Sequence, residues 1–96
     1  MGKLSDVAIR NWVKAGERFE GKGDGEGLYL RYRNGDAVPR WMFRYQFAGQ
    51  ARVLHLGTYT SLSLADARKT AKEMRARVSL GYDVAAEKKE RKHDAV

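Results

Sequence analysis

The sequence contains no cysteine and no long apolar run, and each absence excludes a class of protein. Without cysteine, the 96-residue chain can form neither a disulfide framework nor a cysteine-based zinc site. No apolar run approaches the roughly 20 residues that span a bilayer. Residues 1–6 also lack the apolar segment of a signal peptide. We therefore expect a single-domain cytoplasmic protein that does not associate with a membrane.

Residues that could catalyse a reaction are also scarce. The two histidines, His55 and His93, stand apart from the partners that metal ligation requires. No serine lies in a nucleophile motif. Asp24 and Glu26 fall in a predicted loop, with no apolar surroundings that would suit them to acid–base catalysis. We expect no catalytic residue, no metal and no cofactor, and we predict a binding module rather than an enzyme.

Basic residues outnumber acidic residues, and the excess is concentrated in one part of the chain. Lysine and arginine number 19 against 12 aspartates and glutamates, which gives a formal net charge of +7. Residues 28–60 hold five arginines and one aspartate, whereas residues 1–27 carry five basic and five acidic groups. Arginine suits bidentate contacts with phosphate and guanine. This charge pattern favours a nucleic-acid partner.

Residues 40–59 organise the rest of the chain. Trp41 and Phe43 fall on one side of an alternating run, and Arg44 and Gln46 fall on the other. A period of two is typical of a strand that buries one face. A second alternating run follows after a glycine-containing turn, so the segment predicts a β-hairpin.

The hydrophobic pattern also predicts which residues pair. With Gly49–Gln50 as a type II′ loop, Tyr45 pairs with Leu54 and Phe43 pairs with Leu56. A shift of one residue would mix the two faces, which the alternation forbids.

A further strand, residues 28–33, is predicted to pair Arg33 with Arg40 and so complete an antiparallel sheet of three strands. One face of this sheet is apolar and comprises Leu28, Leu30, Tyr32, Trp41, Phe43, Tyr45, Leu54 and Leu56. The opposite face comprises Tyr29, Arg31, Arg33, Met42, Arg44, Gln46, Val53 and His55. The apolar face needs a cover.

A C-terminal helix is predicted to supply that cover. Ser63 suits the N-cap, and Gly81 suits the residue that ends the helix. An apolar stripe recurs at helical spacing and comprises Leu64, Ala67, Ala71, Met74 and Val78. The basic residues off the stripe are interpreted as a solvated face, and they are Arg68, Lys69, Lys72, Arg75 and Arg77. With a short N-terminal helix over residues 4–12, capped by Ser5, the predicted fold is α+β.

The two remaining segments are interpreted as a loop and a linker. Residues 15–27 contain five glycines. They are predicted to form turns rather than a phosphate-binding loop, because a strand follows them where a phosphate loop needs a helix. The domain is expected to span residues 1–84. The charged residues 85–96 are expected to form a linker toward a further domain, or the start of another helix, frayed or disordered in this chain.

The outward face of the sheet is the predicted binding surface. A sheet can enter the major groove of DNA, where arginine favours guanine and glutamine favours adenine. The candidate DNA-binding residues are Tyr29, Arg31, Arg33, Arg44, Gln46 and His55. The alternative is that these are ordinary solvent-facing residues that keep an open sheet soluble.

An ordered set of short motifs runs through the chain at characteristic spacing. These motifs are Leu4-Ser5-Asp6, Asp24-Gly25-Glu26-Gly27-Leu28-Tyr29-Leu30, Trp41-Met42-Phe43-Arg44-Tyr45, Leu54-His55-Leu56-Gly57-Thr58-Tyr59, Ser63-Leu64-Ala65-Asp66-Ala67-Arg68 and Gly81-Tyr82-Asp83. In this order the chain resembles, over residues 4–92, the N-terminal arm-binding domain of phage-type integrases, a branch of the tyrosine recombinases.

The resemblance implies a three-stranded sheet packed on a helix, which inserts into the major groove of arm-type DNA sites and supports integration and excision. It also implies a bacterial, nucleoid-associated parent protein that continues into core-binding and catalytic domains, so no tyrosine of this chain is assigned as the nucleophile. Other integrase protomers or accessory DNA-bending proteins are implied partners.

The sequence departs from the family pattern at the hairpin tip and leaves two alternative functions open. The turn Gly49-Gln50-Ala51-Arg52 is less basic than the family's, which shifts the expected recognition toward the strands. One alternative is binding of structured RNA or single strands, which requires exposed aromatic residues for stacking. The other is a protein–protein module within a recombinase assembly.

Overall fold

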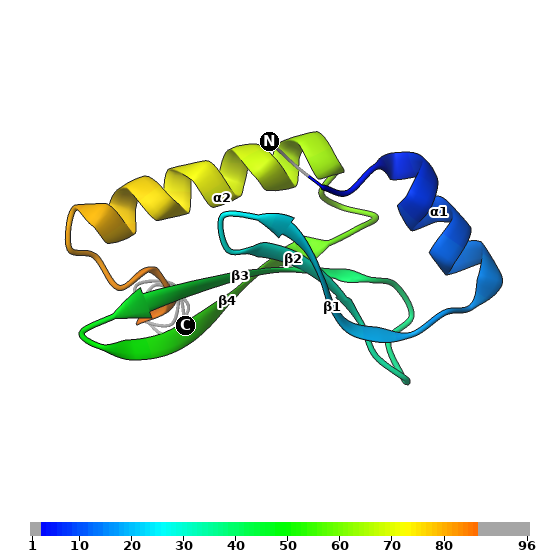
Figure 1. Cartoon of the computed structure of the whole chain (residues 1–96), viewed down its shortest axis with the longest axis horizontal. Helices are drawn as coiled ribbons and strands as arrows, with labels where there is room; N and C mark the ends of the chain where they lie inside the picture. Colours follow the sequence, from blue (N-terminus) through cyan, green and yellow to red (C-terminus); the bar gives the residue numbers. More distant parts are fainter. Residues whose placement is uncertain (1–2, 87–96) are drawn as a thin grey trace, which may run out of the picture.

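The structure, a computed structural model, describes residues 3–86 and shows a four-stranded antiparallel sheet with helices packed on it (Figure 1). The elements in order are α1 (Asp6–Ala15), β1 (Phe19–Gly25), β2 (Leu28–Tyr32), β3 (Arg40–Phe47), β4 (Gln50–Thr58) and α2 (Leu64–Ser79). The strands lie in the order β1-β2-β3-β4. The predicted α+β class is confirmed, but the predicted number of strands, three, is wrong.

The additional strand is β1, which occupies the glycine-rich segment that the sequence predicted to be a loop. It pairs with β2 through two register irregularities, one between Phe19 and Lys22 and one between Gly23 and Gly25. Glycine disfavours strands and has no side chain to bury, so β1 lacks the alternation that marks a strand in a sequence. A Cβ at Gly21 would lie 3.0 Å from the Tyr29 ring, so the glycine leaves room for an aromatic ring across the strand pair.

The predicted faces of β2, β3 and β4 are confirmed, although the pairing differs. Leu28 pairs with Phe43 rather than with Tyr45, and Phe43 pairs with Leu54 rather than with Leu56. Both displacements equal two residues, so every side chain keeps its face. The buried residues of the apolar face are Leu28, Leu30, Tyr32, Trp41, Phe43, Tyr45 and Leu54.

The β3–β4 turn accounts for the displaced pairing. It is formed by Ala48 and Gly49, with φ of 52° and 79°, and not by the predicted type II′ loop. Two positive φ values are typical of a type I′ turn, whose twist matches that of the flanking strands. Further along the ladder, Trp41 pairs with Gly57 and Met42 with His55, so Leu56 is the additional residue of a bulge.

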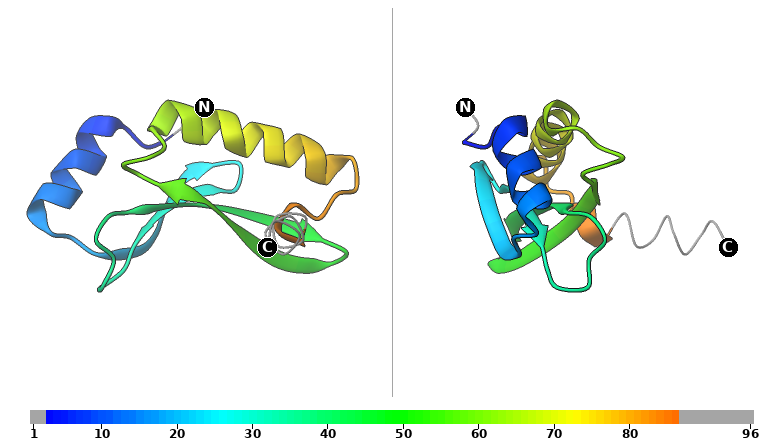
Figure 2. Two further views of the ribbon diagram at one scale, coloured as in Figure 1. Left: turned by 180° about the vertical axis from the view of Figure 1, so that it is seen from behind. Right: turned by 90° about the vertical axis from the view of Figure 1, so that its right-hand side faces the viewer.

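Both predicted helix caps are confirmed, and both helices pack on the same side of the sheet (Figure 2). Ser5 Oγ accepts from the Ala8 amide at 3.2 Å, and Ser63 Oγ accepts from the Asp66 amide at 3.1 Å. Helix α1 ends at Ala15, later than predicted, and its Ile9 is fully buried. The predicted stripe of α2 faces the core: Leu64, Ala67 and Ala71 are buried, and Met74 and Val78 pack against them.

The chain returns to β3 and β4 after α2. The Tyr45 hydroxyl donates to the Asp83 carboxylate and accepts from the Ala85 amide, and Arg52 Nε lies 3.2 Å from Asp83 Oδ2. The hydrogen bond from Tyr45 is the main cause that lowers the pKa of Asp83. Val84 is 2% exposed and belongs to the core. The predicted charged linker lies, beyond its first two residues, outside the described residues.

Candidate nucleic-acid interface

The face of the sheet that the helices leave open carries a groove of about 580 Å³. Its walls come from β1, β2 and β3, and its basic residues are Lys3, Arg31, Arg33 and Arg44. Much of its lining is glycine backbone, from Gly21, Gly23, Gly25 and Gly27. Backbone without side chains allows a ligand to approach closely, and the surrounding cations favour an anionic ligand.

The structure brings four of the six predicted site residues together in this groove. Tyr29, Arg31, Arg33 and Arg44 all line it. The other two lie elsewhere, and they are Gln46, exposed near the end of β3, and His55, half-buried on β4.

Met42 is buried on the outward face, which the sequence did not predict. Its cross-strand neighbours are Tyr29 and His55, and only 5% of the residue is exposed. Tyr29 and His55 therefore flank Met42 on both sides, and the neighbours of Met42 form the outward surface.

Arg44 is held beside an aromatic ring. Its guanidinium carbon lies 5.3 Å from the centre of the Tyr29 ring. The Tyr29 ring in turn lies over Gly21, where a Cβ would approach Cδ2 to 3.0 Å. A cation over a ring keeps its N–H groups available at its edge. Gly21, Tyr29 and Arg44 therefore stack in sequence, and this stacking fixes the position of the Arg44 guanidinium in the groove.

The other two arginines of the groove differ in their surroundings. Arg33 Nε lies 2.8 Å from Glu20 Oε2. Arg31 Nε is buried and has no hydrogen-bond partner among residues 3–86. The groove therefore holds one arginine paired with a carboxylate and one with an unused buried donor.

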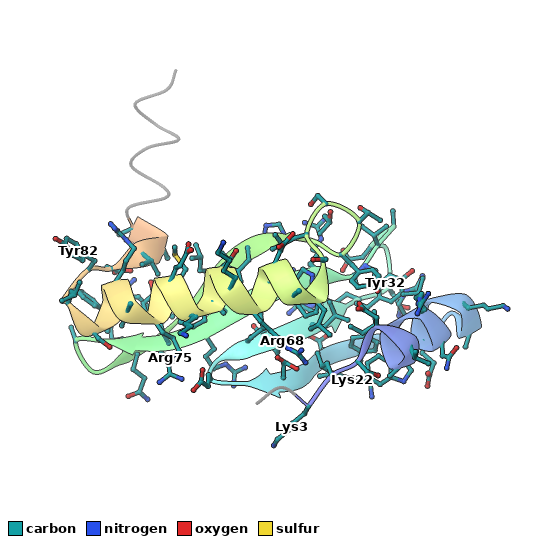
Figure 3. The ribbon with its side chains drawn as sticks, turned by 90° about the horizontal axis from the view of Figure 1, so that it is seen from above. Lys3, Lys22, Tyr32, Arg68, Arg75 and Tyr82 are labelled. Carbon is teal, nitrogen blue, oxygen red and sulfur yellow. The ribbon has the colours of Figure 1, made fainter. Side chains whose placement is uncertain are left out.

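Lys3 and Glu20 are groove residues that the sequence analysis missed. The Lys3 amide donates to the Asp24 carbonyl at 3.1 Å, which places this residue beside β1 (Figure 3). Glu20 belongs to the strand that was predicted to be a loop. Recognising β1 would have placed Glu20 beside β2, but the glycines concealed the strand pattern.

Three arginines of α2 have partners: Arg68 and Arg75, which are exposed as predicted, and Arg77, which is half-buried. Arg68 binds the buried Asp24 with Nε at 2.9 Å and Nη2 at 3.0 Å. Arg75 lies 3.5 Å from Glu26, and the Arg77 guanidinium lies 4.8 Å from the Tyr82 ring centre. Arg68 is exposed, as predicted, and the sequence did not predict that β1 brings a carboxylate beneath the helix for it to bind.

Other kinds of site are not found in the part of the chain that the structure describes. Among residues 3–86, no group of three histidine, aspartate or glutamate side chains could hold a metal ion. Within the same range, neither helix is long and apolar enough to cross a membrane.

Comparison with known proteins identifies relatives of this chain. A family model described as "Arm DNA-binding domain" matches residues 4–91. The "Integrase" of Shigella phage Sf6 is 36% identical over 66 residues, which cover 69% of this chain and 17% of that protein. The "Prophage integrase IntS" of Escherichia coli strain K12 matches with the same identity and the same coverage. The aligned segment is therefore a small part of each relative.

Proposed function

The chain belongs to the arm DNA-binding domain family of phage and prophage integrases, and from this premise we propose that it binds arm-type sites by placing the open face of its sheet in the DNA major groove. The groove between β1, β2 and β3 carries the proposal, because Lys3, Arg31, Arg33 and Arg44 converge there. Gln46 and His55 extend the proposed contact surface along β3 and β4.

The shape of the surface favours duplex DNA over a single strand. Single-strand binders stack bases on exposed aromatic rings. On the outward face, the Tyr29 ring is already flanked by Gly21 and Arg44. The major groove admits a two-stranded β-ribbon, and Arg31 and Arg44 stand on two neighbouring strands, β2 and β3.

We expect the affinity for duplex DNA to fall steeply with salt, because lysine and arginine release counterions from the phosphates they contact. The slope of log K against log salt should lie between about −3.6 and −5.4, which corresponds to roughly four to six contacts. Fluorescence anisotropy of the 96-residue chain with duplex DNA, duplex RNA and single strands measures it. A slope near zero for every nucleic acid would support the protein–protein alternative, and tighter binding to single strands or to RNA would support the RNA alternative.

Arg44→Ala is expected to weaken binding to the preferred duplex by about 1–3 kcal/mol and to weaken binding to random duplex less. The residue is exposed on β3 and is held over Tyr29, so its N–H groups face the ligand. Arg10→Ala is the matched control, because it removes the same charge from the exposed side of α1. Equal losses on both duplexes would make Arg44 a phosphate contact rather than a base contact.

The wider context of the domain follows from the same proposal. We infer a full-length parent that is a site-specific tyrosine recombinase acting on integration and excision, in which this chain binds DNA and another domain performs catalysis. Other protomers of that parent and accessory DNA-bending proteins are its proposed partners. Action on phage and bacterial DNA would place it in the cytoplasm, at the nucleoid. The proposed domain spans residues 1–84.

A further inference from the structure

We propose that Glu20 is a positioning residue that orients Arg33 to read a base edge, so that Arg33 is a specificity-determining residue of the interface. This inference rests on the proposed function, because it assigns roles within the same groove. It assigns a base contact to Arg33 beside the one already tested at Arg44.

The groove contains one carboxylate among its basic side chains. Among the described residues that line the groove, Glu20 alone is acidic, and it lies with Lys3, Arg31, Arg33 and Arg44. A carboxylate at a DNA-binding surface repels phosphates, so it weakens any purely backbone contact. A carboxylate there is favourable when it orients an arginine for a directional hydrogen bond to a base edge.

The contact between Glu20 and Arg33 uses one particular atom of the guanidinium. Glu20 Oε2 lies 2.8 Å from Nε of Arg33. Among residues 3–86, no hydrogen bond is found from the two terminal nitrogens of Arg33. The terminal nitrogens form the fork that matches O6 and N7 of guanine. The carboxylate therefore holds the inner edge of the guanidinium and leaves its recognition edge open.

The backbone of Arg33 is fixed as well. Its amide donates to Asp36 Oδ2 at 3.1 Å, and its carbonyl accepts from the Asp36 amide at 3.0 Å. The residue directly follows β2, and its side chain is 52% exposed. A fixed backbone and a held Nε reduce the rotamer freedom that a long side chain loses on binding. Arg33 is thus pre-organised in the free protein.

The other arginines of the groove lack this arrangement. Arg44 is held by the neutral face of Tyr29, and Arg31 has no ion pair with any residue between 3 and 86. Neither guanidinium is therefore oriented at Nε by a carboxylate. We therefore assign base reading to Arg33 through its carboxylate partner.

The test compares the 96-residue chain with Glu20→Gln and Glu20→Ala. The probes are the tightest 20-base-pair duplex that the unaltered chain selects from a random library and a scrambled duplex of the same composition. Glu20→Ala should bind the selected duplex about two- to fivefold more weakly and the scrambled duplex about twofold more tightly. Glu20→Gln should show a smaller loss, because its amide oxygen still accepts from Nε.

Glu73→Gln is the matched control. It changes the net charge by the same amount on the exposed side of α2, so both affinities should rise together by about twofold at most. Since Glu20 is 80% exposed in its side chain, the variants should fold, and circular dichroism checks this. If Glu20→Ala changes both affinities by the same factor, Glu20 acts only through its charge and the inference is wrong.

A base analogue tests directly whether Arg33 contacts a guanine. Each guanine of the selected duplex is replaced in turn by 7-deazaguanine, which lacks the N7 acceptor. We expect one position where the unaltered chain loses about tenfold in affinity and Arg33→Ala loses nothing further. If no position behaves so, Arg33 does not read guanine. If the unaltered chain shows no salt-dependent preference for any duplex, the proposed function itself fails and the inference fails with it.

Discussion

Asp24→Asn is expected to lower the free energy of unfolding by about 1–3 kcal/mol, because it removes the charge of a buried carboxylate that accepts hydrogen bonds from Arg68 and Leu4. The Asp24 side chain is 4% exposed. Its two oxygens accept from Arg68 Nε at 2.9 Å, from Arg68 Nη2 at 3.0 Å and from the Leu4 amide at 2.8 Å. Arg68 Nη2 also donates to the Leu4 carbonyl at 2.8 Å. One carboxylate therefore joins the N-terminal segment, β1 and α2.

Urea denaturation monitored by tryptophan fluorescence measures the loss. Glu26→Gln removes the same charge from the β1–β2 turn, where the carboxylate is 71% exposed and 3.5 Å from Arg75. An exposed pair of this kind contributes little, so the control should change stability by about 0.5 kcal/mol or less. Equal effects of the two substitutions would show that the Asp24–Arg68 pair stabilises the fold no more than a surface pair does.

The same pair gives the domain a pH dependence of known sign. The hydrogen bond from Arg68 is the main cause that holds the pKa of Asp24 below its ordinary value, and it outweighs burial, which acts in the opposite direction. A carboxyl with a depressed pKa in the folded state contributes stability that is present above the unfolded pKa of about 3.9. That contribution is lost as the pH falls through the folded pKa. The difference between the unaltered chain and Asp24→Asn should therefore shrink below about pH 4.

The sequence predicted the features of the fold that local chemistry determines. Alternation in residues 40–47 assigned the faces, and Ser5 and Ser63 marked the helix starts, because each signal depends on neighbours along the chain. The exact pairing could not be obtained this way, since a displacement of two residues leaves every face unchanged. The turn decided it, and Ala48 adopts a positive φ that no sequence pattern requires.

The features that depend on tertiary contacts were not predictable in the same way. Asp24 and Arg68 are 44 positions apart, and the residues around Asp24 carry no local sign that its carboxylate is buried. The outward arginines on β2 and β3 followed from strand parity. These arginines line one groove only because β1 forms a wall of it, and the glycines of β1 hide the strand pattern in the sequence. Glu20 and Lys3 were therefore missed together, because both reach the groove only through that strand.

Gly27→Ala is expected to destabilise the domain by about 3 kcal/mol or more, through two separate effects. Gly27 has a φ of +89°, in the region where a side chain is strained. A Cβ there would lie 2.3 Å from the Arg44 carbonyl oxygen and 3.1 Å from Cε1 of Phe43. The Gly27 carbonyl also accepts from the Arg44 amide at 2.8 Å. The strand that carries Arg44 would have to shift to admit the methyl group.

Two other glycines separate the strain from the clash. Gly35 has a φ of +95°, and no atom lies within 4 Å of the place that a Cβ would take, so Gly35→Ala should cost only the strain, about 1–2 kcal/mol. Gly23 has neither a positive φ nor a neighbour, so Gly23→Ala should change stability little. Because Gly27 and Arg44 bond directly, Gly27→Ala should also weaken DNA binding at temperatures where the domain remains folded, whereas Gly35→Ala should not. If Gly27→Ala and Gly35→Ala destabilise equally, β2 and β3 are not held as closely at Arg44 as the structure requires.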